Sequence, residues 1–132
     1  NQMRAGGDII VSTFVKPSTT EDHTVLQAEA TGIPCGIAQN AGRLHPSPDF
    51  SQADISLAAK DGESLQVHTA GETSVDLLCG GTWAAGDFLI PMAGGGGTPA
   101  TGGSWAGARA LSAGVIGRLC PVEVLQPTWV PA

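Results

Sequence analysis

The feature that most constrains this chain is a run of short apolar segments, each ended by glycine, over residues 66–91. Within it, Val75, Leu77 and Cys79 recur at every second position, the period of a strand with one buried face. An earlier strand begins at residue 67, before this alternating stretch, and another strand follows it at 88–90. The turn into that last strand contains Gly and Asp, two residue types that tolerate the φ angles of tight turns. Because parallel strands need long crossover connections, such closely spaced strands predict antiparallel pairing in a compact β-meander.

Composition points to a small, turn-rich protein. Only 14% of the residues are charged, whereas glycine occurs 19 times, a combination that favours many tight turns between short strands. A chain of 132 residues can bury one core and is too short for two ordinary domains. We therefore predict a mainly β, single-domain protein with at most one or two short helices.

The chain divides into three parts. Residues 1–8 lack periodicity and contain a glycine pair, which predicts a flexible, mobile N-terminal arm able to add a strand to a neighbouring chain. Residues 9–126 form the predicted β-rich domain, which begins and ends with strong strand patterns. Residues 127–132 form a proline-bounded tail whose Trp129 either folds back on the core or meets a partner, and we favour the partner.

Three segments are less regular. Residues 105–113 predict either a short Ala-rich helix or an edge strand. Residues 41–50 contain two prolines and predict an irregular loop, after which Ser51 could cap a brief turn. The glycine-rich segment 93–103 predicts an exposed loop. No phosphate site is expected there, because no helix with a Lys-Ser or Lys-Thr pair follows.

Charge and hydrophobicity argue against nucleic-acid binding and against a membrane-spanning or secretory segment. The formal net charge is −6, and the chain has only six lysines and arginines. These are too few to line a groove for a phosphate backbone, so no nucleic-acid binding is expected. No apolar run approaches the roughly 20 residues needed to span a bilayer, and the N-terminus lacks a basic segment followed by an apolar one. We therefore expect neither a membrane span nor a secretory signal.

The cysteine and histidine patterns predict no catalytic or metal centre. Cys35, Cys79 and Cys120 are widely spaced and odd in number, which favours neither a disulfide framework nor a zinc site. We predict three buried, reduced and unreactive thiols. The three histidines form no ligand-spaced pair, and no Gly-x-Ser-x-Gly motif occurs. The chain is therefore expected to be no enzyme and to use no cofactor and no metal.

Several short motifs follow one another in a set order. They are the strand at 9–15, Cys-Gly-Ile-Ala-Gln-Asn at 35–40, Ala-Ala-Gly-Asp-Phe-Leu at 84–89 with a Gly-rich loop after it, residues 107–114, and Val-Glu-Val-Leu at 122–125. In this order and spacing the chain resembles a family of tailed-phage capsid decoration (cement, or head-stabilising) proteins. The likeness covers roughly residues 9–126, whereas the proline-containing loop at 44–50 and the tail are particular to this sequence.

The resemblance implies a small antiparallel β-barrel or β-tulip-like fold and a structural role in a virion. Such proteins sit on the outer surface of an expanded capsid, commonly as trimers, and hold neighbouring capsomers together against internal DNA pressure. For this chain it implies the major capsid protein as partner, a homotrimer on the capsid, and synthesis in the host cytoplasm. The candidate capsid or subunit contacts are Asn1, Gln2, Met3, Arg4, Ala5, Trp105 and Trp129.

Two other interpretations remain open at this point. A particle-displayed module that binds a receptor or a glycan would be favoured by an exposed aromatic, such as Trp83 or Trp105, beside an Asp or Asn. A small hydrolase would need a concave pocket that brings histidine together with cysteine or carboxylate side chains. The number of copies per particle separates a cement protein from the receptor- or glycan-binding module, because a cement protein is abundant and a fibre module is scarce.

Overall fold

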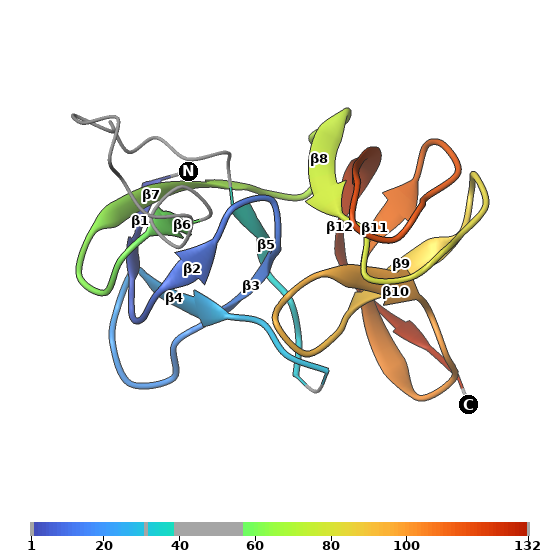
Figure 1. Ribbon diagram of the computed structural model, residues 1–132. Coiled ribbons are helices and arrows are strands. Elements are labelled where there is room, and N and C mark those ends of the chain that lie inside the picture. Colours follow the sequence, from blue (N-terminus) through green and yellow to red (C-terminus); the bar gives the residue numbers. More distant parts are fainter. Residues whose placement is uncertain (1, 31, 39–56, 132) are drawn as a thin grey trace, which may run out of the picture.

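The computed structural model describes residues 2–30, 32–38 and 57–131. The regular secondary structure in these ranges is entirely β-strand, with no helix among them, which confirms the predicted mainly β fold. Figure 1 shows two parts packed into one small domain, a closed barrel and a second sheet. The predicted loop at 41–50 and the turn at Ser51 lie outside the described residues.

The first half of the chain forms a closed barrel with the strand order β1-β4-β3-β5-β7. Antiparallel pairing of β1 with β7 closes it, with Met3 opposite Leu65. The β1–β4 pair is parallel and the other barrel pairs are antiparallel. The barrel strands are β1 (Gln2–Ala5), β3 (Phe14–Pro17), β4 (Thr24–Gln27), β5 (Gly36–Ala38) and β7 (Ser64–His68), beside a small pair of β2 (Ile9–Ile10) and β6 (Leu57–Ala59).

The second half forms a five-stranded antiparallel sheet with the order β10-β9-β11-β12-β8. A bridge between Cys79 and Gly97 brings the end of β8 to the start of β10. The Gly80 amide also donates to the Gly97 carbonyl at 2.8 Å. The strands are β8 (Val75–Leu78), β9 (Phe88–Pro91), β10 (Gly97–Pro99), β11 (Ser104–Ala110) and β12 (Leu119–Val130).

Two apolar clusters stabilise these parts. The barrel cluster fills the barrel and consists of Ala5, Ile9, Val15, Val25, Ala38, Ala59, Leu65 and Val67. The main cluster lies between barrel and sheet and consists of Phe14, Ala28, Ile37, Val75, Leu77, Cys79, Trp83, Leu89, Ala108, Ala110, Cys120, Val122 and Val124.

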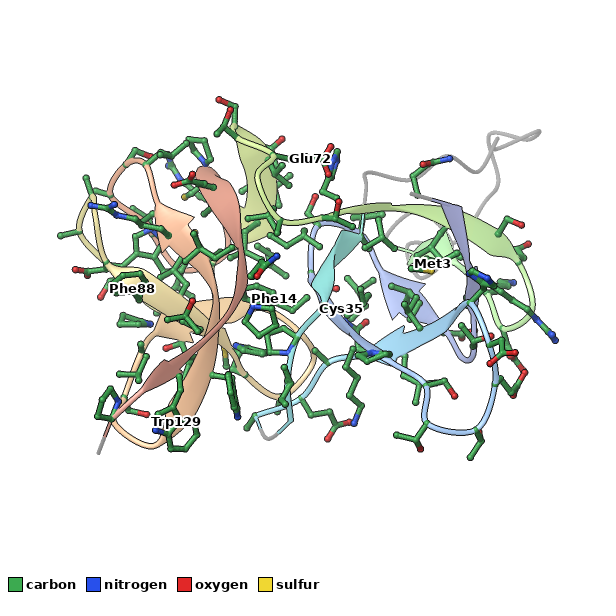
Figure 2. The ribbon with its side chains drawn as sticks, turned by 180° about the vertical axis from the view of Figure 1, so that it is seen from behind. Met3, Phe14, Cys35, Glu72, Phe88 and Trp129 are labelled. Atoms are coloured by element: carbon green, nitrogen blue, oxygen red, sulfur yellow. The ribbon has the colours of Figure 1, made fainter. Side chains whose placement is uncertain are left out.

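Two barrel strands contribute to both clusters. Adjacent residues of a strand point to opposite faces, so Val15 and Ala38 fill the barrel while Phe14 and Ile37 enter the main cluster. Figure 2 shows Phe14 between the two parts. The sheet is thereby packed on the outside of the barrel, and the two parts share one core.

The predicted arm over residues 1–8 is wrong for its described residues. Residues 2–5 form β1, which pairs with β4 on one side and β7 on the other. The Gly6 amide donates to the Val25 carbonyl at 2.9 Å, and Asp8 Oδ1 accepts from the Asp61 amide at 3.2 Å. β1 therefore lies inside the barrel's own sheet, between β4 and β7, and is not an arm held away from the domain.

The predicted meander is also wrong, although its strands are present. β7 pairs with β1 and β5, β8 pairs with β12, and β9 pairs with β10 and β11. After β7 the chain crosses from the barrel to β12, where the Gly71 amide donates to the Val124 carbonyl and the Val124 amide to the Glu72 carbonyl. The Gly-containing turn therefore passes between two sheets instead of closing a hairpin.

The predicted exposed loop over 93–103 is only partly right: residues 93–94 and 101–103 are exposed, but residues 97–99 between them form β10. Gly95, Gly96 and Gly97 are buried, and the Phe14 amide donates to the Gly95 carbonyl at 2.7 Å. A Cβ atom on Gly97 would lie 2.6 Å from Leu77 Cδ2. Glycine is required here because the backbone packs directly against the core.

The two alternatives for residues 105–113 are resolved in favour of a strand. Residues 104–110 form β11, which lies inside the sheet between β9 and β12 and not at an edge. The predicted tail is largely strand as well, because β12 continues through Val130 and pairs Thr128, Trp129 and Val130 with β11.

Candidate functional site

The end of the β11–β12 hairpin extends beyond its neighbours. β9 pairs with β11 at Ala108 and Arg109, and β8 pairs with β12 over residues 119–122. Ser104–Ala106 and Thr128–Val130 lie beyond these pairings and bond to each other. We call this part, residues 104–106 with 128–130, the ribbon; Figure 1 shows it pointing away from the barrel.

The ribbon carries two tryptophans side by side. Trp105 lies opposite Trp129 in the β11–β12 register, and their rings meet edge to face with centroids 5.3 Å apart. Such pairs contribute about 0.5–1.5 kcal/mol beyond their area burial. Trp129 is nevertheless 49% exposed, and Figure 2 shows it at the end of the sheet far from the barrel. The pair is therefore preorganised yet accessible.

The two stretches of sequence that carry this pair are uncharged. Residues 98–107 and 125–131 contain no Asp, Glu, Lys or Arg, although the whole chain carries a formal charge of −6. The cores of protein interfaces are rich in aromatic residues and poor in charged ones. The ribbon thus combines the features of an interface core on an otherwise acidic protein.

The N-terminal candidates lie elsewhere. Ala5 is fully buried, Met3 packs against the barrel cluster, and Arg4 Nη1 lies 3.7 Å from Glu21 Oε2 on the surface. Gln2 pairs through its backbone with Gln66, and Asn1 lies outside the described residues. Figure 2 places Met3 on the opposite side from Trp129. The structure therefore does not bring the two predicted groups of contact residues together.

A polar cavity of about 280 Å³ lies where the barrel meets the sheet. Two of its residues, Ser12 and Ser74, have positive φ angles of 56° and 58°, a conformation that costs about 1–3 kcal/mol outside glycine. Among the residues that the structure describes, no Phe or Trp side chain lines it. Sequence patterns did not find it, because it forms only where distant segments meet. Its lining is Ser12, Ala38, His68, Glu72, Thr73, Ser74, Val75 and Asp76.

Glu72 at this cavity yields a pH prediction. The Thr69 amide donates to its carboxylate and His68 Nδ1 lies 3.3 Å from Oε1, and both lower the pKa of Glu72 below its ordinary value. A carboxyl with a lowered folded pKa stabilises the fold above its unfolded pKa and loses that effect as pH falls through the folded pKa. Glu72→Gln should therefore reduce the free energy of unfolding slightly at neutral pH and hardly at all in acid. A difference that stays constant in urea titrations across this range would contradict this.

Trp83 is not the surface aromatic that a glycan-binding module needs. Its exposed fraction is 6%, and its Nε1 donates to the Ser112 carbonyl at 3.1 Å. It belongs to the main cluster. Of the two tryptophans suggested for stacking, Trp83 is therefore excluded and Trp105 is half-buried against Trp129.

The described residues contain no group of three or more His, Cys, Asp or Glu side chains placed to hold a metal ion. His68 contacts Glu72, while Cys79 contacts Cys120. Burial raises the pKa of the Cys35 thiol, so it is protonated at neutral pH. Within residues 2–30, 32–38 and 57–131, no helix is long and apolar enough to be a membrane-spanning segment.

Comparison with solved structures places this architecture beside a phage protein. The chain is similar to the N base of head fiber gp8.5 of bacteriophage phi29, with a TM-score of 0.57 and 16% sequence identity. What they share is the fold. The alignment covers 97% of this chain and 94% of that one. No protein-family model and no curated protein matches the sequence.

The likeness to the gp8.5 base extends over nearly the whole of both chains, although their sequence identity is low. An alignment over 97% of the chain includes both the barrel and the sheet. The overall arrangement of the fold is therefore what the two chains have in common. Function does not follow from fold alone, so the ribbon's own chemistry has to support any functional conclusion.

Proposed function

We propose that this chain is a structural protein of a phage virion that binds the outer surface of the head. The observation that supports this best is the shared fold with the phi29 head fiber base over nearly the full length of both chains. The motif order in the sequence independently resembles phage capsid decoration proteins. Two routes that use different information thus lead to a head-associated protein.

The ribbon is the surface we assign to attachment on the major capsid protein. Its aromatic pair is exposed at Trp129 and lies in two uncharged stretches of sequence. Tryptophan is among the residues that dominate binding energy at interfaces. β1 already pairs with β4 and β7 within the closed barrel, so we assign attachment to side-chain contacts at the ribbon and not to the strand addition that the sequence suggested.

The finer role we propose is cementing. A homotrimer on the capsid would present three ribbons at once, and simultaneous engagement multiplies weak contacts into lasting attachment. Binding the expanded lattice more tightly than its alternatives stabilises that lattice by mass action. Heads stripped of the protein should then release DNA at a lower temperature than complete heads.

Cosedimentation tests the function and its location separately. Purified protein is mixed with expanded heads that lack it, and bound copies per particle are counted. Wild-type protein should sediment with the heads in high copy. Trp129→Ser should bind about 30-fold more weakly, because an aromatic anchor is worth about 2 kcal/mol or more. Phe88→Ser is the matched control, since Phe88 is 45% exposed and lies outside the ribbon.

Each outcome has one meaning. Wild-type protein that stays in the supernatant would refute the head-binding function. Wild-type binding with an unaffected Trp129→Ser variant would leave the function and refute the ribbon as its surface. Few bound copies per head would contradict cementing and favour display of a fibre or a receptor-binding module.

A further inference from the structure

Two cysteines from distant parts of the sheet meet inside the main cluster. Cys79 directly follows β8 and Cys120 is the second residue of β12. Their Sγ atoms are 2.9 Å apart although 41 positions separate them in sequence. This is within about 1 Å of the length of a disulfide bond, which is about 2.05 Å. Both side chains are buried, with exposed fractions of 2% and 7%.

Backbone pairing holds the two residues in place. The Cys79 amide donates to the Arg118 carbonyl at 2.8 Å, and the Gly117 amide donates to the Cys79 carbonyl at 2.9 Å. Cys120 lies opposite Leu77 in the β8–β12 ladder. The two thiols are therefore brought together by the sheet itself, and a bond between them needs only a small side-chain adjustment.

We infer that Cys79 and Cys120 are the two halves of an intramolecular disulfide that forms when the folding chain meets a small disulfide oxidant such as oxidised glutathione. The thiolate of one cysteine attacks the oxidant, giving a mixed disulfide and one reduced glutathione. The second cysteine then attacks its neighbour's sulfur and releases another reduced glutathione. The chain loses two protons and two electrons, and one glutathione disulfide is reduced to two thiols.

The folded chain resists this reaction. Burial, together with the hydrogen bond to Cys120, raises the pKa of Cys79 to about 12, so almost no thiolate is present at neutral pH, and the thiolate is the attacking species. The buried sulfurs are also inaccessible to glutathione. The bond therefore forms during folding, before the main cluster closes.

Cys35 is not a competing partner in the native fold. It packs against the barrel cluster and lies between β4 and β5 in the chain, whereas Cys79 and Cys120 belong to the main cluster. The expected product has one disulfide and one free thiol. Its cross-link encloses β9, β10 and β11, and closing a loop of this length restricts the unfolded chain.

Refolding under two redox conditions tests the inference. Wild-type protein is unfolded in denaturant and refolded with either reduced or oxidised glutathione. The oxidised sample should lose the mass of two hydrogen atoms, keep one titratable thiol, and yield a peptide joining Cys79 to Cys120. Its melting temperature should be about 10 °C higher than that of the reduced sample.

Two variants sharpen the result. Cys35→Ser should behave as wild type, with no thiol left after oxidative refolding. Cys120→Ala should show neither the mass loss nor the rise in melting temperature. Three free thiols in oxidised wild-type protein, a bond involving Cys35, or a stable glutathione adduct on Cys79 would each overturn the inference. These readouts do not depend on the proposed virion function.

Discussion

Replacing Phe14 with alanine should lower the free energy of unfolding by about 3–5 kcal/mol, the cost of removing a fully buried phenylalanine. Phe14 has no exposed surface and stands in a barrel strand while its ring packs in the main cluster. A Cβ atom on Gly107 would lie 2.9 Å from Phe14 Cε1, so the Phe14 ring packs directly against the backbone of β11. Because this backbone is held in the sheet, it cannot move in to fill the cavity that alanine would leave. A loss of this size is a large fraction of a typical domain's stability.

Urea denaturation measures this effect when it is followed by one probe of the barrel and one probe of the sheet. Phe88→Ala is the control, because Phe88 is 45% exposed on the sheet and should change stability by about 0.5 kcal/mol or less. If Phe14 joins barrel and sheet, its removal should also separate their unfolding into two transitions. Equal losses from Phe14→Ala and Phe88→Ala would show that the two parts are not packed through Phe14.

The strands that sequence alone predicted well have one buried face. In β8, Val75 and Leu77 are buried while Asp76 is exposed, and β12 alternates in the same way at Val122 and Val124. This alternation is a local property of an extended chain at a core surface. It says nothing about which strand lies alongside, and the strands predicted to form a meander accordingly do not pair with one another: β7 pairs with β1 and β5, β8 with β12, and β9 with β10 and β11.

β1 could not be predicted from its own residues. Its sequence is Gln-Met-Arg-Ala, and only Ala5 is fully buried, so no hydrophobic pattern marks it as a strand. It is held by backbone pairing on both sides within the closed barrel. Such pairing depends on β4 and β7 being in place, which is information that a local window does not contain.

The candidate site was predictable in part. Trp105 and Trp129 stood out as tryptophans in small-residue and proline-bounded surroundings, but their contact with each other depends on the β11–β12 register. That register shifts between Ala106 and Ala108, and no local pattern fixes such a shift. The meeting of Cys79 with Cys120 depends likewise on the pairing of β8 with β12.

Replacing Gly36 with alanine should cost about 3 kcal/mol or more, at or above the upper end of overpacking effects. Gly36 is buried in β5, where a Cβ atom would lie 2.4 Å from the His68 carbonyl oxygen and 2.6 Å from Val67 Cγ1. The backbone of β7 cannot rotate away as a flexible side chain can. β5 and β7 would have to separate, which strains the closure of the barrel.

Gly7→Ala is the matched control for this substitution. A Cβ atom there would meet no atom within 4 Å, so alanine should leave stability unchanged or raise it by up to about 1 kcal/mol by restricting the unfolded chain. Urea midpoints of the two variants measure the contrast, and hydrogen exchange should localise the Gly36→Ala damage to β5 and β7. If both variants matched wild type, the close approach of β5 to β7 at Gly36 would be refuted, because a buried methyl group cannot occupy the space of a carbonyl oxygen.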